Sequence, residues 1–203
     1  MSFRALDIDF EEVIIIDLLS EAERRKFQIS EDLRSDLAAL GIPQFHLSCY
    51  NKDHVFQALN WSADRLRTAN FVLHFTAHGN KDGIGLKATN EFIPWQELRG
   101  SLQNLNKKME GNLIVNMMAC KGISGVSIQS FEDPAEPFFG IIGPVKDIDI
   151  FRAKAIGKTF YEKMLNGIQI PTIVLGINNA EGETVLWCNS SQLRRGAGQQ
   201  LSL

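Results

Sequence analysis

Cysteine and histidine are scarce in this sequence and follow none of the spacings of common metal or disulfide sites. The three cysteines, Cys49, Cys120 and Cys188, lie far apart, and no CxxC pair occurs. Their odd number and wide separation predict neither a disulfide framework nor a structural zinc site. The four histidines do not form the HExxH pattern of zinc peptidases, so we expect no metal.

An excess of positive charge and a long apolar run are also missing. Lys and Arg number 21 against 24 Asp and Glu, which gives a formal net charge of -3. Proteins that bind nucleic acids usually gather Lys and Arg on one face, so we expect no nucleic-acid partner. No stretch approaches the roughly 18 apolar residues of a membrane span, and the first residues lack the apolar core of a secretion signal. We therefore expect a cytoplasmic protein that does not bind membranes.

Apolar residues are patterned as strands that alternate with helices. The β-branched run at residues 13–18 predicts a buried strand, and Ile29, Leu33 and Leu37 after it have helical spacing. Further strands are expected at residues 45–49, 71–76, 113–118, 138–142 and 184–188, and further helices from Asp53, from Trp95 and over residues 151–167. This order predicts a three-layer α/β fold with a mainly parallel central sheet flanked by helices.

Three other segments need separate interpretations. Asp82-Gly83 is a hairpin turn signal that leads into short strands expected at residues 84–87 and 91–93, which predicts a small β-hairpin excursion. Residues 121–137 are polar and contain Gly and Pro, so we expect an exposed loop there. Residues 172–180 fit a strand or a helix equally well. We expect a single domain over residues 1–190 and, over residues 191–203, a polar C-terminal tail whose composition favours disorder.

His78 and Cys120 each follow a predicted buried strand. Because the carboxyl ends of parallel strands meet at one edge of a sheet, both residues should emerge where ligands bind in such folds. An imidazole beside a thiol can take its proton and later protonate the leaving amine of a peptide bond. We therefore expect Cys120 as nucleophile and His78 as general base, with the backbone N–H groups of Gly79 and Cys120 as the oxyanion hole. His74 is expected to be a structural, hydrogen-bonded histidine.

The residues around this pair resemble motifs of a known family. Residues 76–79, Thr-Ala-His-Gly, look like the His-Gly turn of caspase-like cysteine peptidases, and residues 116–122, Asn-Met-Met-Ala-Cys-Lys-Gly, look like their strand that ends in Ala-Cys. The similarity is greatest to the CHAT branch, which includes relatives of separase, and it covers roughly residues 13–188. Against the signature Gln-Ala-Cys-[Arg/Gln/Gly]-Gly, Met118 and Lys121 depart while the other three positions agree.

The resemblance implies a caspase-like/CHAT peptidase domain that hydrolyses peptide bonds of a protein target through an acyl-enzyme, without a metal or cofactor. It also implies an activating or inhibitory protein partner and a role in bacterial immunity, including antiviral defence, or programmed death. In several family members the residue at the position of Met118 lines the pocket for the substrate residue before the cut. An uncharged Met118 speaks against strict cleavage after Arg or Lys and mildly favours an apolar or small residue, although Asp147 and Asp149, or Arg152, are further candidates for that pocket.

Two alternatives remain beside the active peptidase. The same fold can serve as a catalytically silent, caspase-like interaction module that binds a partner through its loops, because function is carried by sites and not by folds. A different α/β module that binds nucleotides is disfavoured, because neither GxGxxG at the start of a helix nor GxxxxGK[ST] occurs.

Overall fold

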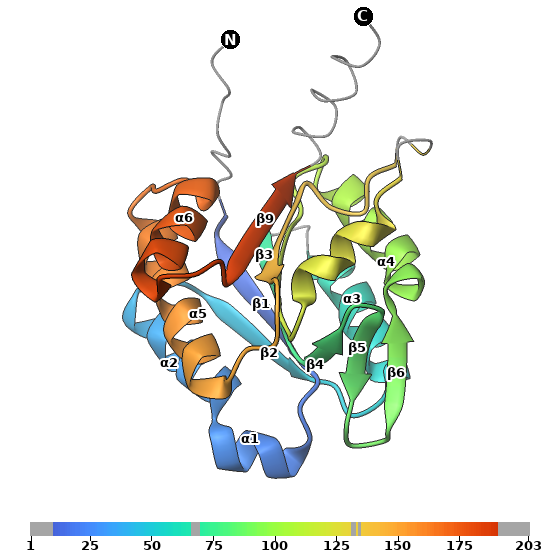
Figure 1. Cartoon of the computed structure of the whole chain (residues 1–203). Coiled ribbons are helices and arrows are strands. Elements are labelled where there is room, and N and C mark those ends of the chain that lie inside the picture. The colour runs from blue at the N-terminus through green and yellow to red at the C-terminus, as the bar shows by residue number, and fades with distance from the viewer. Residues whose placement is uncertain (1–9, 66–69, 131–132, 134, 191–203) are drawn as a thin grey trace, which may run out of the picture.

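A six-stranded sheet forms the centre of the computed structural model, which describes residues 10–65, 70–130, 133 and 135–190 (Figure 1). Its strand order is β2-β1-β3-β7-β8-β9. The pairings are parallel up to β8, and β9 runs antiparallel to β8. The strands are β1 (Glu12–Asp17), β2 (Gln44–Ser48), β3 (Phe71–Thr76), β7 (Ile114–Met118), β8 (Gly140–Pro144) and β9 (Leu186–Ser190).

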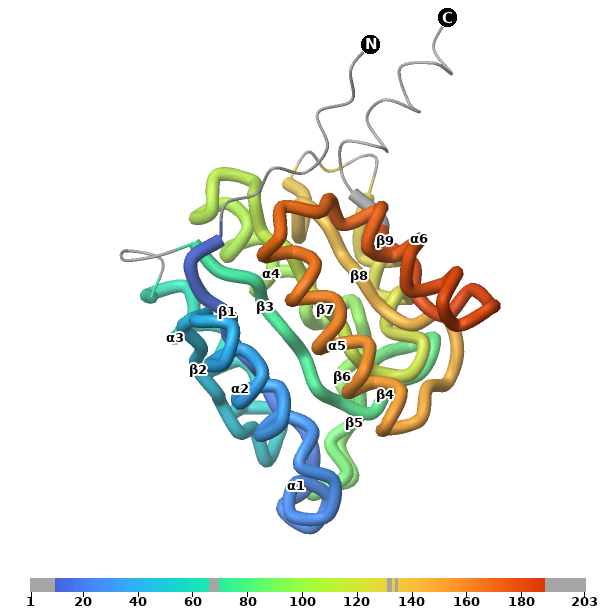
Figure 2. Tube along the Cα trace, turned by 90° about the vertical axis from the view of Figure 1, so that its left-hand side faces the viewer, coloured from blue at the N-terminus to red at the C-terminus, as the bar shows by residue number. Residues whose placement is uncertain are grey.

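Helices cover both faces of this sheet, as the alternation of elements predicted. One face packs against α3 (Lys52–Arg65) and α4 (Trp95–Lys108), and the other against α2 (Ile29–Ala39), α5 (Ile150–Leu165) and α6 (Ile170–Glu181). Figure 2 shows the second group lying in front of the strands. Side chains of β1 alternate between two apolar clusters, with Ile14 and Ile16 on the α3 side and Val13 and Ile15 on the α2 side. The predicted three-layer α/β fold is therefore confirmed.

The expected hairpin excursion is present as a separate, three-stranded antiparallel sheet. It consists of β4 (His78–Asn80), β5 (Gly83–Leu86) and β6 (Glu91–Pro94). The side chain of Asn80 accepts hydrogen bonds from the backbone N–H groups of Asp82 and Gly83, which closes the turn. Since β4 starts at His78, this small sheet fixes the backbone of the predicted base.

Some local predictions were incomplete or wrong. Helix α1 (Glu21–Phe27) was not expected, and the ambiguous segment at residues 172–180 lies in helix α6. The exposed loop expected at residues 121–137 is wrong over η1 (Gly122–Ile128), a 3-10 helix in which Gly122, Gly125 and Ile128 are buried. A Cβ on Gly122 would lie 2.1 Å from the carbonyl oxygen of Met117, so the turn packs directly on the end of β7.

Two further expectations concern the tail and the membrane. The tail predicted at residues 191–203 lies outside the described residues. Among the helices of the described chain, none combines the length and the apolar character that crossing a bilayer requires.

Candidate active site

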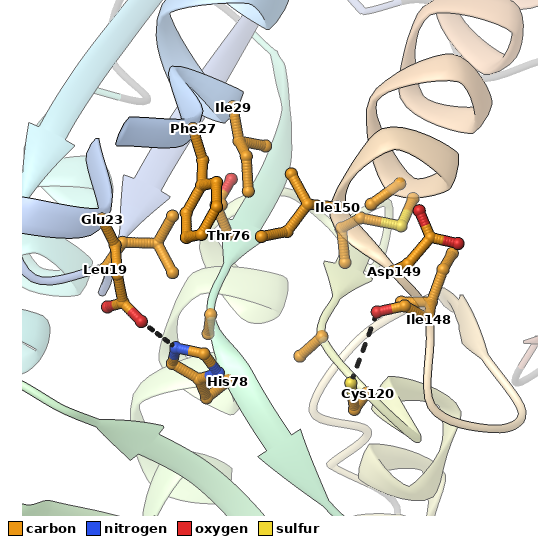
Figure 3. Close-up of a pocket in the computed structure, with 14 residues that line it drawn as sticks. Leu19, Glu23, Phe27, Ile29, Thr76, His78, Cys120, Ile148, Asp149 and Ile150 are labelled. Atoms are coloured by element: carbon orange, nitrogen blue, oxygen red, sulfur yellow. Dashed lines mark hydrogen bonds and ion pairs between the residues drawn. The ribbon is translucent and has the colours of Figure 1, made fainter. Parts of the chain in front are cut away.

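A cavity of about 300 Å³ opens where β3 and β7 end (Figure 3). Thr76 and Met118, the last residues of these neighbouring strands, are partners in the parallel register. The chain therefore leaves both strands at the same level, and His78 and Cys120 both line the cavity. Besides this pair, the lining is mostly apolar and consists of Leu19, Phe27, Ile29, Ala77, Met118, Ala119, Ile148, Ile150 and Ala153, together with Thr76, Glu23 and Asp149.

His78 is oriented by a carboxylate from α1. Its Nε2 lies 2.8 Å from Oε1 of Glu23, whereas its side chain is 49% exposed. The same oxygen accepts a hydrogen bond from Nζ of Lys87 at 3.0 Å. Figure 3 shows the imidazole turned toward this carboxylate on the α1 side of the cavity. Glu23 thus holds the predicted base from a helix that the sequence did not lead us to expect.

Glu23 is itself fixed by the start of its helix. Ser20 and Glu23 form a capping box, in which the Glu23 carboxylate accepts hydrogen bonds from the backbone N–H and the hydroxyl of Ser20. Burial alone would raise the pKa of this carboxyl, but hydrogen bonds from Ser20, His78 and Lys87 outweigh burial and lower the pKa to about 2. The Glu23 side chain is therefore an anion at neutral pH.

An anionic Glu23 decides which ring nitrogen of His78 can act as a base. A carboxylate only accepts hydrogen bonds, so Nε2 of His78 must carry the proton that Glu23 receives. In neutral imidazole the other nitrogen, Nδ1, then carries a lone pair. The contact with Glu23 thus selects the tautomer in which Nδ1 is the proton acceptor.

Cys120 lies on the opposite side of the cavity, at the end of β7. Its Sγ lies 3.8 Å from the carbonyl oxygen of Ile148, and the residue is partly exposed. The two other thiols differ from it. Burial raises the pKa of Cys49 to about 12, with a further contribution from Asp17, and burial also raises the pKa of Cys188. Cys120, the thiol predicted from the sequence, therefore lines the cavity, and Cys49 and Cys188 are less suited to form a thiolate.

Backbone contact joins the two sides of the cavity. A Cβ placed on Gly79 would lie 2.8 Å from the carbonyl oxygen of Cys120 and 3.0 Å from Cβ of Ala119. Only glycine permits β4 to approach the end of β7 so closely. No hydrogen bond links the side chains of His78 and Cys120, both of which belong to the described part of the chain. The oxyanion hole of Gly79 and Cys120 N–H groups stays a prediction.

The three candidates for substrate contact are placed differently. Met118 is buried and lines the cavity. Asp149 also lines it, but its carboxylate accepts a hydrogen bond from the backbone N–H of Arg152 and caps helix α5. Asp147 is not among the lining residues, and its 76% exposed side chain lies 3.7 Å from Nζ of Lys121.

His74 has the structural role that was expected. It is buried under α5, where its Nδ1 lies 3.0 Å from the hydroxyl of Tyr161. Burial lowers the pKa of His74 to about 3, so the ring is neutral. Among the described residues, no group of three or more His, Cys, Asp or Glu side chains is arranged to hold a metal ion.

Known proteins resemble this chain in three-dimensional structure but not in sequence. No protein-family model matches the sequence, and no curated protein matches it. Among solved structures, the caspase drICE is similar with a TM-score of 0.53 and 12% sequence identity, over 91% of this chain and 90% of that chain. At this identity the likeness concerns the fold. The chain has a caspase-like fold, that of a class of cysteine peptidases.

Proposed function

We propose that this protein is a cysteine endopeptidase that hydrolyses peptide bonds of a specific protein target. The observation that carries the proposal is the shared cavity at the carboxyl edge of the sheet, into which one partly exposed thiol and one carboxylate-held imidazole both face. A thiol is a competent nucleophile once it loses its proton, and an imidazole of fixed tautomer is a suitable acceptor for that proton.

The reaction follows the chemistry of a Cys-His dyad. Nδ1 of His78 takes the proton of the Cys120 thiol, and the thiolate adds to the carbonyl carbon of the scissile bond. The imidazolium, stabilised by Glu23, then gives its proton to the leaving amine as the C–N bond breaks. Water hydrolyses the resulting thioester, again with His78 as base, and the free thiol is regenerated. In this scheme Glu23 is a positioning residue, because it acts through His78.

A protein partner is proposed as the activator. With no hydrogen bond between His78 and Cys120, the substrate or a partner must bring the two side chains together, and such contacts often tighten only in the complex. We further propose that the protein is related to the CHAT branch and acts in the cytoplasm as a bacterial immune or cell-death effector. The His-Gly and Ala-Cys motifs support this part of the proposal.

The test compares wild type with Cys120→Ala and His78→Ala on a peptide library, with an activity-based thiol probe as a second readout. Each variant is expected to lose at least about a thousandfold in cleavage rate while its circular dichroism and unfolding midpoint stay unchanged. Cys188→Ala is the matched control and should keep full activity, because its thiol lies on β9 outside the cavity lining. Undiminished cleavage by either dyad variant would refute the mechanism.

A catalytically silent interaction module is the second candidate. It is favoured by one observation: the polar contact of Cys120 Sγ is with the carbonyl of Ile148 and that of the His78 ring is with Glu23, so these two described residues share no hydrogen bond. This alternative predicts that wild type, supplied with its partner, cleaves nothing, and that the Cys120 thiol titrates like that of a model peptide. Labelling of Cys120 that depends on His78 would exclude it.

A further inference from the structure

We infer that the cavity beside Cys120 receives an uncharged, apolar side chain of the substrate, namely that of the residue whose carbonyl is attacked. The inference rests on the proposed peptidase function and adds the class of substrate to it. When the carbonyl carbon of a residue lies at Sγ, the side chain of the same residue lies next to it. The cavity that Cys120 and His78 line is therefore the space open to that side chain.

Apolar side chains form most of the surface of this space. Phe27 and Ile29 face it from α1 and the start of α2, while Ile148 and Ile150 face it from the segment before α5 and from the first residue of α5 (Figure 3). These four are only half-buried, so part of their apolar surface meets the open cavity. An apolar substrate side chain would remove this surface from water, which favours binding. The cavity thus has the character of a binding pocket for hydrocarbon.

The charged groups at the cavity are already engaged. Oε1 of Glu23 accepts from His78 and Lys87, and Oε2 accepts from Ser20, so the carboxylate has partners on both oxygens. Asp149 caps α5. Among the described residues that line the cavity, none is Lys or Arg. An anionic substrate side chain would therefore find no Lys or Arg on this lining, and a cationic one would compete with the hydrogen bonds that Glu23 and Asp149 already accept.

The inference can be tested with three thiol-reactive peptide probes that differ only in the residue next to the electrophile, which is leucine, arginine or aspartate. The modification rate of Cys120 is measured by mass spectrometry on the full chain. The leucine probe is expected to react at least about tenfold faster than either charged probe. Asp149→Asn should keep this order, because asparagine also caps helices.

Substitutions at two neighbouring residues test whether the cavity wall determines which probe reacts faster. Ile150→Asp puts a carboxylate into the cavity wall and should favour the arginine probe over the leucine probe by about tenfold relative to wild type. An Asp at the start of α5 is compatible with the helix dipole, so the variant should fold. Phe151→Asp is the control, because Phe151 is adjacent in sequence but 80% exposed and outside the cavity lining, and it should leave the order of rates unchanged.

The possible outcomes distinguish the apolar preference from the proposed peptidase function. Equal rates with all three probes, or a faster charged probe in wild type, would overturn the apolar preference and leave the peptidase intact. Failure of every probe to modify Cys120, while iodoacetamide still alkylates it, would count against the peptidase itself. A loss of arginine labelling only in Asp149→Asn would assign the pocket to a cationic side chain instead.

Discussion

The two walls of the cavity are built by different forces. On the His78 side, Glu23 joins the imidazole, the Lys87 ammonium and the start of α1 by charge-assisted hydrogen bonds. On the Cys120 side, Sγ has one long contact, 3.8 Å to the carbonyl of Ile148, and the lining residues Ile148, Ile150 and Ala153 are apolar. The His78 imidazole is therefore held by other side chains of the chain itself, whereas Sγ of Cys120 has a single long contact and faces the open cavity.

The two sides of the cavity should therefore respond to different changes. Hydrogen bonds depend on the direction of donor and acceptor, so the orientation of His78 should be sensitive to pH and to the loss of one carboxylate oxygen of Glu23. Apolar contacts depend on shape, so the Cys120 wall should respond to changes in volume and to buried charge. Three perturbations test this contrast, and they are given from the largest expected effect to the smallest.

Gly79→Ala should separate the two walls and have the largest effect. The added Cβ would lie 2.8 Å from the Cys120 carbonyl oxygen, so β4 or the end of β7 must shift. A displacement near 1 Å in such a site can cost about a hundredfold in cleavage rate, and overpacking costs about 1–3 kcal/mol of stability. Gly85→Ala is the control in the same small sheet, because its Cβ would meet nothing nearer than 3.8 Å. Equal rates for the two variants would show that the close approach has no functional weight.

Glu23→Gln should affect the polar wall alone. The glutamine keeps the size of the side chain but no longer selects the tautomer of His78, so we expect cleavage to slow by about tenfold or more at neutral pH, within the range of general-base effects. The shape of the pH–rate profile should change as well, which a purely structural role would not produce. Glu21→Gln serves as control, since Glu21 pairs with the exposed Arg25 on the same helix. An unchanged profile in Glu23→Gln would remove Glu23 from the mechanism.

The same carboxyl should make stability depend on pH, with the smallest effect of the three. Hydrogen bonds outweigh burial and lower the pKa of Glu23 from 4.5 to about 2 in the folded protein. Since the folded pKa lies below the unfolded pKa, ionised Glu23 stabilises the fold fully above pH 4.5, and this contribution is lost as the pH falls toward 2. In urea unfolding, the advantage of wild type over Glu23→Gln should be constant near neutrality and shrink below pH 4.5. An advantage that persists unchanged into acid would contradict this account.

Much of the fold and half of the site could be predicted from the sequence, because those parts depend on strong local patterns. Strands β3 and β7 are short, fully buried and mostly apolar, and the chain beyond their carboxyl ends brings His78 and Cys120 to one edge. The short strands expected at residues 84–87 and 91–93 were found as β5 and β6, and Asp82-Gly83 lies at the turn between β4 and β5, although β4 itself was not expected.

Glu23 was missed because its helix has no apolar stripe. Helix α1 has only seven residues, five of them charged, so periodicity could not reveal it. One signal was present, since Ser20 followed by Glu23 has the spacing of a capping box. Even that signal would not have linked Glu23 to His78, because their contact is made by tertiary packing of segments 55 residues apart.

The predictions for two other segments were incomplete or wrong for related reasons. The β-branched residues Ile173, Val174 and Ile177 suit a strand as well as a helix, and the packing of α6 against the sheet decides between them. The stretch that begins at Gly122 looked like loop because of its polar and glycine-rich composition. Its burial comes from contact with the backbone of β7, which no local pattern records.

The contact between Gly122 and Met117 has a consequence for how this protein can change over evolution. Directly after Cys120, the chain packs against main-chain atoms of β7, with no space for a side chain between them. The position of the Cys120 thiol therefore depends on backbone geometry, which most side-chain substitutions do not change. Under the proposed function, substitutions in the surrounding wall would reshape the pocket while Sγ of Cys120 stays in place.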